Sequence, residues 1–357
     1  MGTRRWVATG LVTAGAVLAA WGAWNHDGAR APGRQGKMVR GPTAKPSRGA
    51  GPGHVERAPR VATRPPEGEV IVRAAWGAEV GALGRKSPSE GAPEAPMSFA
   101  IDGRGRVHVL DQLNTRIEIF EPGHEPRVVA LPSDTFQDID VDARGRVVAV
   151  DRLATQTVAF LDDSGQLDHT VPLDGPGVPE GGAVTALFTR EDGTWIEVEH
   201  KELVRIADAS GEPDPDRPAV AGRFSADGSS LLRAGIEGPS SVRVTSQPAS
   251  GHGAAMTASL AFPMSVLAVH ALESDRQGRI YLAVNLIRES EQAPFDVTDE
   301  RETVVVLAKD GRELGRVDIA PPQGPEEQFR PIRVGDDGQI YQLVCNETGA
   351  TIERFSL

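Results

Sequence analysis

Residues 99–123, which decide the fold of this chain, read Phe-Ala-Ile-Asp-Gly-Arg-Gly-Arg-Val-His-Val-Leu-Asp-Gln-Leu-Asn-Thr-Arg-Ile-Glu-Ile-Phe-Glu-Pro-Gly. They contain three short apolar runs separated by polar turns, and a fourth apolar run follows at 128–131. Glycine supplies the positive φ that tight turns need, and Asp and Asn hydrogen-bond their own backbone there. The pattern predicts a four-stranded antiparallel meander. Such a sheet cannot bury both faces alone, so it needs similar neighbours.

The same unit recurs along the chain. Residues 142–146, Asp-Ala-Arg-Gly-Arg, repeat the first turn forty residues later, and weaker copies follow. The turn glycines are Gly105, Gly145, Gly193, Gly228, Gly278 and Gly338. Units of about 40–50 residues with four strands each are typical of β-propellers. The six turns therefore predict an all-β, six-bladed β-propeller.

Residues 111–120, Asp-Gln-Leu-Asn-Thr-Arg-Ile-Glu-Ile-Phe, make the prediction more specific. They resemble the NHL repeat, whose blades read roughly Asp-x-x-Asn-x-Arg-Ile-x-Val-Phe after a Gly-x-Ile-Tyr-Val strand. Residues 278–282 and 338–343 match the first half of that pattern, whereas units three and four match poorly. The resemblance implies an NHL-like six-bladed propeller over residues 69–357. It implies no particular activity, because one fold serves many functions.

A single strand precedes the first unit. Residues 69–76 read Glu-Val-Ile-Val-Arg-Ala-Ala-Trp without the rest of a blade, and the chain ends straight after the third strand of unit six. Propellers of this type often close their ring by letting an N-terminal strand complete the last blade. We therefore expect residues 69–76 to close the ring, which would remove the open sheet edges of a linear array.

The N-terminal part has a different composition. Residues 1–24 begin with Arg4 and Arg5 and continue as an uncharged, largely apolar run. This predicts a signal peptide or an N-terminal membrane anchor, and hence export to the periplasm or the extracellular space. Residues 25–68 are rich in Pro, Gly and Arg and have no apolar periodicity. That composition predicts a disordered linker.

Charge is unevenly distributed along the chain. The whole chain has 38 basic and 50 acidic residues; residues 1–68 contain 11 and 3 of them, which leaves 27 and 47 for residues 69–357. An acidic propeller argues against a nucleic-acid partner, because phosphates require a positive surface. The basic N-terminal segment either contacts anionic lipid head groups or is a solvated spacer. We expect a monomer.

The common catalytic and metal-binding motifs are absent from the sequence. The single cysteine, Cys345, excludes an intramolecular disulfide, and no His-x-His, His-Glu-x-x-His or Gly-x-Ser-x-Gly occurs. One constellation remains: Asp111, Asp151 and Glu199 each lie six residues after the turn glycine of their unit. Three carboxylates on neighbouring blades could hold a divalent cation such as Ca²⁺ or Zn²⁺. Alternatively, each accepts hydrogen bonds from its own turn, and no cofactor is needed.

The face that carries these acids is the expected ligand face. The charged insertion 287–302, between the second and third strands of unit five, is expected to form a long loop there. The first strand of unit five is expected at 272–274. Besides the three acids, the residues expected at this face or near the channel are Asp138, His270, Phe295, Gln328 and Arg330. The opposite face, with Gly105 and Gly145, is expected not to bind.

Two functions stay open from the sequence. The first is a binding module that presents this face to a protein, a glycan or a small ligand. The second is a metal-dependent propeller enzyme of the lactonase or lyase type, with a divalent cation in the central channel. A missing ligand set favours the binding module, because no full group of Glu, Asn, Asp and His lines the predicted first strands.

Overall fold

The computed structural model of the chain describes residues 68–88, 91–162, 164–293, 295–321 and 324–357. The signal or anchor expected at residues 1–24 lies outside the described residues, as does nearly all of the linker expected at 25–68. Within the described ranges, no helix is long and apolar enough to span a membrane.

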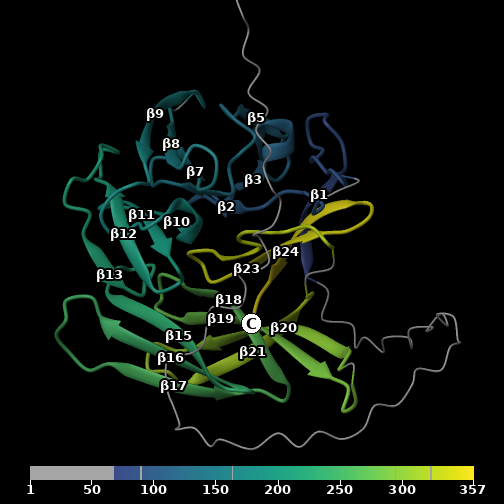
Figure 1. The fold of residues 1–357 in the computed structure, drawn as a ribbon, viewed down its shortest axis with the longest axis vertical. Coiled ribbons are helices and arrows are strands. Elements are labelled where there is room, and N and C mark those ends of the chain that lie inside the picture. Colours follow the sequence, from purple (N-terminus) through teal and green to yellow (C-terminus); the bar gives the residue numbers. More distant parts are fainter. Residues whose placement is uncertain (1–67, 89–90, 163, 294, 322–323) are drawn as a thin grey trace, which may run out of the picture.

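Six four-stranded antiparallel sheets follow one another around a ring (Figure 1). Blade one contains β2 (Phe99–Ile101), β3 (Val107–Asp111), β4 (Arg116–Phe120) and β5 (Arg127–Ala130). Blade two contains β6 (Asp138–Val141), β7 (Val147–Asp151), β8 (Thr157–Leu161) and β9 (Leu167–Pro172). Blade three contains β10 (Val184–Arg190), β11 (Gly193–Val198), β12 (Glu202–Ala207) and β13 (Ala219–Ala221).

The remaining blades complete the ring. Blade four contains β14 (Arg223–Phe224), β15 (Ser230–Gly238), β16 (Ser241–Pro248) and β17 (Met256–Ala261). Blade five contains β18 (Ser265–Ser274), β19 (Ile280–Glu289), β20 (Val297–Leu307) and β21 (Glu313–Ile319). Blade six contains β22 (Ile332–Val334), β23 (Ile340–Cys345), β24 (Gly349–Phe355) and β1 (Glu69–Ala75). The prediction of an all-β, six-bladed propeller is confirmed.

The last blade is built from both ends of the described chain. β1 pairs antiparallel with β24, and Val72 lies opposite Ile352. The strand expected at residues 69–76 to close the ring is thus the outer strand of blade six. Val72 and Ala74 are buried in a cluster that also contains Phe99 of blade one. The closing strand therefore contributes to the contact between the last blade and the first.

The repeated turn explains why the meander forms. Asp102 Oδ1 accepts the N–H groups of Arg104 and Arg106, both at 2.9 Å. Gly105, between them, has φ = 77°, a conformation that side chains disfavour. Asp142 makes the same two bonds in blade two. In blades one and two the Asp and the Gly are therefore needed by the backbone of the turn between the first and second strands.

The charged insertion of blade five differs from the sequence prediction. The prediction of a long loop over residues 287–302 is wrong, because β19 and β20 continue to pair through most of it, with Ile287 opposite Glu300. The first strand is also longer than the expected 272–274, since β18 begins at Ser265. The reason is tertiary. Leu286, which directly precedes the insertion and lies opposite Arg301, is buried in a cluster with apolar side chains of blade four. The paired strands thus gain packing that their charged neighbours conceal in the sequence.

Candidate functional site

The middle of the ring is closed by a network of charges. Asp138, on the inner strand β6, is fully buried and pairs with Arg330 and Arg333, each at 3.2 Å. Arg330 also pairs with Glu273 at 3.0 Å and lies over the ring of Phe188. Burial alone would lower the pKa of Arg330, but the carboxylates of Asp138 and Glu273 raise it above its usual value. Two of the predicted site residues, Asp138 and Arg330, thus tie inner strands together.

The structure does not bring the three predicted turn acids together as a metal site. Asp111 pairs with Arg116 at 2.8 Å, and Asp151 accepts three N–H groups of its own turn. Glu199 is exposed and pairs with Lys201. Across the described part of the chain, no group of three or more His, Cys, Asp or Glu side chains could hold a metal ion. Asp111 and Asp151 have the bonding expected of structural turn acids.

Phe295, the expected contact anchor, lies at the end of the β19–β20 hairpin. Its side chain is 56% exposed, and its φ of 60° is in the left-handed region that non-glycine residues rarely adopt. The structure gives it no contact with the other predicted site residues.

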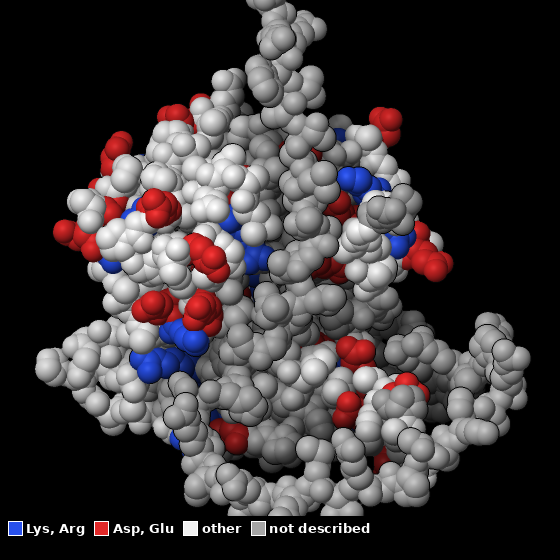
Figure 2. Space-filling view, in the orientation of Figure 1, with Lys and Arg blue, Asp and Glu red and all other residues white. Residues whose placement is uncertain are grey.

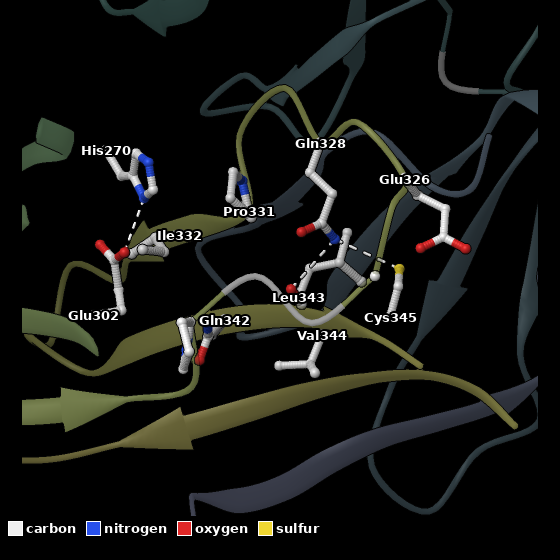
Figure 3. Close-up of a pocket in the computed structure, with 12 residues that line it drawn as sticks. His270, Glu302, Glu326, Gln328, Pro331, Ile332, Gln342, Leu343, Val344 and Cys345 are labelled. Atoms are coloured by element: carbon white, nitrogen blue, oxygen red, sulfur yellow. Dashed lines mark hydrogen bonds and ion pairs between the residues drawn. The ribbon is translucent and has the colours of Figure 1, made fainter. Parts of the chain in front are cut away.

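His270 and Gln328 do lie together, in a small cavity between blades five and six (Figure 3). We call it the His270 cavity. His270 comes from β18, Glu302 from β20 and Gln342 from β23, and the connection from β21 to β22 supplies Gln328. The lining residues are His270, Glu302, Pro321, Gly324, Glu326, Gln328, Pro331, Ile332, Gln342, Leu343, Val344 and Cys345.

A buried imidazole–carboxylate pair forms one wall of the His270 cavity. His270 Nδ1 lies 2.9 Å from Glu302 Oε2, and the Glu302 side chain is fully buried. Burial alone would lower the pKa of His270, but Glu302 and Glu300 together raise it above its usual value. Asn285 Nδ2 donates to the same Glu302 oxygen at 3.3 Å. The pair is therefore held in place, with one Glu302 oxygen engaged and one not.

Three lining residues of the cavity carry a buried oxygen without a hydrogen-bond partner among the described residues: Glu302 Oε1, Gln342 Oε1 and Glu326 Oε2. The orientation of Gln342 is determined by its amide nitrogen, which donates to Ala320 O at 2.6 Å. Glu326 uses its other oxygen for Arg85, at 2.6 Å. Leaving a buried acceptor without a donor costs folding free energy. A group that donates hydrogen bonds would therefore bind favourably in this cavity.

The remaining polar groups of the His270 cavity are already paired. Gln328 Nε2 donates to Leu343 O at 3.3 Å and lies 3.5 Å from Cys345 Sγ. Burial raises the pKa of the Cys345 thiol to about 12, so the thiol stays protonated. A side chain at residue 324 would collide with the unpaired carboxylate oxygen of Glu326, so the glycine leaves room for that oxygen.

A second small cavity shares His270 with the first. Its other polar lining includes Glu197, His200 and Arg223. Arg223 binds Glu197 through two nitrogens, at 2.5 and 2.8 Å. Burial would raise the pKa of Glu197, but Arg223 and His200 lower it far below its usual value. This carboxylate is thus fully engaged.

A much larger cavity than the His270 cavity opens on the opposite face, where the sequence predicts no binding. This funnel is bounded by the turns that contain Gly105 and Gly145, and Phe188, Arg330 and Arg333 line it from the channel. The centre of a water molecule can reach about 1160 Å³ in the funnel and about 20 Å³ in the His270 cavity. None of the residues lining the funnel has a buried side-chain polar atom without a partner in the described ranges.

Sequence reasoning missed Glu302, Glu326 and Gln342. Gln342 interrupts the apolar run Ile340–Val344, and a polar residue inside an otherwise buried strand was the available signal. Glu302 directly precedes the buried run Thr303–Leu307 but was assigned to the charged insertion. Glu326 had no sequence signal, since its role depends on the fold of a connection.

Comparisons with known proteins find only distant structural likenesses. No known family and no curated protein matches the chain. Among solved structures, a gluconolactonase from Xanthomonas campestris is 13% identical, with a TM-score of 0.44 over 83% of this chain and 100% of that one. A virginiamycin B lyase from Staphylococcus aureus is 10% identical, with a TM-score of 0.40 over 73% of this chain and 95% of that one. A likeness this distant carries no argument about activity.

Proposed function

We propose that this protein is a binding module for a small ligand, and that part of the ligand enters the His270 cavity. The observation that carries the proposal is the set of three buried, unpaired acceptors on Glu302, Gln342 and Glu326. Buried polar groups in folded proteins nearly always have partners. A ligand that donates hydrogen bonds would supply them.

The size of the His270 cavity favours a small ligand over a protein or a glycan. Its inner part admits a single water-sized group. The cavity therefore suits a small molecule, or the end of one, better than a protein surface or a sugar ring. The funnel is larger, yet none of the described residues that line it has a buried side-chain polar atom without a partner. Volume alone therefore does not identify the ligand site.

The second candidate function is a lactonase- or lyase-like enzyme. The observation that favours it is the His270–Glu302 pair, since a carboxylate-oriented imidazole is a common general acid or base. A metal-dependent version is less well supported, because the described residues offer no group of three His, Cys, Asp or Glu ligands. Metal analysis of the purified protein tests the metal-dependent enzyme, and a stoichiometric divalent cation would favour it over the binding module.

Thermal-shift measurements with a panel of small amines, amides, sugars and polyols test the binding proposal. A ligand at a hundred times its dissociation constant stabilises the folded protein by about 2.7 kcal/mol, which gives a clear rise in melting temperature. We expect Gln342→Leu to abolish the rise and Arg104→Ala, at the funnel, to preserve it. The reverse pattern, or no rise with any compound of the panel, would refute the proposal.

The cellular setting is also a proposal. We infer from residues 1–24 that the protein is exported to the periplasm or the extracellular space. We also propose that it is a monomer with an NHL-like propeller, and that the basic segment before residue 69 contacts the membrane. The side chains in Figure 2 show acidic residues scattered over the periphery of the propeller, which supports a partner other than nucleic acid. Fractionation of cells expressing the full chain tests export, and recovery in the cytosol would contradict it.

A further inference from the structure

We infer that the group bound in the His270 cavity is a primary ammonium. The inference rests on the proposed function and specifies the chemistry of its ligand. It is carried by three properties of the cavity, which are the type of its unpaired atoms, its charge and its size.

The unpaired buried atoms of the cavity lining are all acceptors. Glu302 Oε1 and Glu326 Oε2 are carboxylate oxygens, and Gln342 Oε1 is an amide oxygen. The bond from Gln342 Nε2 to Ala320 O fixes which end of that amide lacks a partner. The matching ligand group must therefore donate several hydrogen bonds and need accept none, as an ammonium group does.

The formal charges around the cavity favour a cation. Glu302 is paired with His270, and Glu326 with Arg85. Glu300 bonds Asn285, the neighbour of Glu302, and adds a further carboxylate. In this set the three carboxylates outnumber the cationic side chains whether or not His270 is protonated, so an added positive charge is favoured. Hydrogen bonds from a charged donor to a carboxylate are also about twice as strong as neutral ones.

The size of the cavity selects among cationic groups. The inner part admits one water-sized group, and an ammonium is close to water in size. A guanidinium is planar and larger, and a quaternary ammonium is larger and has no donor. Figure 3 shows Glu302 and Gln342 on one side of the cavity and Glu326 on the other, with Gln328 between them. A donor beside Glu302 and Gln342 is therefore separated from Glu326 by Gln328, so the unpaired oxygens of Glu302 and Gln342 carry the inference.

Calorimetric and thermal-shift titrations of the full chain with four probes at constant ionic strength test the inference. The probes are methylammonium, formamide, tetramethylammonium and potassium, all as simple salts or neutral solutes. Formamide has donors without charge, tetramethylammonium has charge without donors, and potassium has neither donors nor a carbon framework. We expect methylammonium to bind at least about tenfold more tightly than each of the others, a difference of about 1.4 kcal/mol.

Two variants locate the binding. Glu302→Gln keeps the shape and removes the charge, and Gln342→Leu removes one acceptor; each should weaken methylammonium binding by about tenfold or more. The matched control is Glu199→Gln, because Glu199 is exposed and pairs with Lys201 on the surface. If Glu302→Gln fails to fold, the comparison of probes on the unaltered chain still decides the question.

The outcomes separate this inference from the proposed function. Equal or tighter binding of formamide, tetramethylammonium or potassium at the cavity would overturn the ammonium and leave the binding module standing. Methylammonium binding that Glu302→Gln and Gln342→Leu do not weaken would overturn it as well. If no compound of the larger panel and none of these probes binds, the proposed function fails with it.

Discussion

Replacing Asp138 by asparagine tests whether the charge network in the channel holds the blades together. The substitution keeps the shape of the side chain and removes its charge. Asp138 faces Arg330 and Arg333, each at 3.2 Å, and all three side chains are buried. One carboxylate oxygen becomes an amide that donates, so at least one guanidinium would meet a donor instead of an acceptor.

The structure sets the expected magnitude. Removing one member of a buried ion pair costs about 3–5 kcal/mol, because the other charge is left uncompensated. Here Arg330 keeps Glu273 and the carbonyl oxygen of Leu187 at 2.6 Å, and Arg333 keeps two carbonyl oxygens at 2.7 Å. The loss should therefore lie at the lower end, about 3 kcal/mol. For a domain of this size that is a fall in melting temperature of about 6–12 °C.

Scanning calorimetry or circular dichroism at neutral pH measures this difference. Glu199→Gln is the control, since an exposed pair such as Glu199–Lys201 contributes only about 0–1 kcal/mol. An Asp138→Asn protein that melts within about 2 °C of the unaltered one would show that the network does not stabilise the ring.

Three further predictions concern closure, titration and the cysteine. Removing residues 1–75 should lower the melting temperature relative to removing 1–67, because β1 buries Val72, worth about 1.5–3 kcal/mol; equal melting would contradict the closure. Glu302 and Glu300 outweigh burial and raise the pKa of His270 in the folded protein. The contribution of protonated His270 to folding stability is therefore fully present below the pKa that His270 has in the unfolded chain. This contribution is lost as pH rises through the pKa of His270 in the folded protein. Melting curves between about pH 5 and pH 9 should show the decrease in stability for the unaltered chain and not for Glu302→Gln. Cys345, with a pKa raised to about 12 by burial, should resist iodoacetamide in the native protein and react once it is unfolded; native labelling would refute its burial.

The propeller could be predicted from local sequence because its turns are local. The Asp–Gly turns bond within about four residues of the chain, and each strand between them is short and apolar. The six turns were enough to predict six blades, and the spare strand at 69–76 was enough to predict how the ring closes. Such features need no knowledge of distant contacts.

The length of the strands in blade five could not be predicted in this way. Half of residues 287–302 are charged, and a charged run between two strands favours a loop. The extension pairs as a hairpin since Leu286 packs against blade four. That contact joins blades, so it has no signature within the hairpin itself.

The sequence by itself determined the all-β class, the repeat and the excess of acidic residues over basic ones in the propeller. The tertiary structure alone decided what each carboxylate does. Asp138 and Glu302 are both acids close to apolar runs, yet Asp138 meets two arginines and Glu302 retains an unpaired oxygen in a cavity. The physical reason is that such partners are set by the fold: those of Asp138 come from another part of the ring and lie nearly two hundred residues away along the chain.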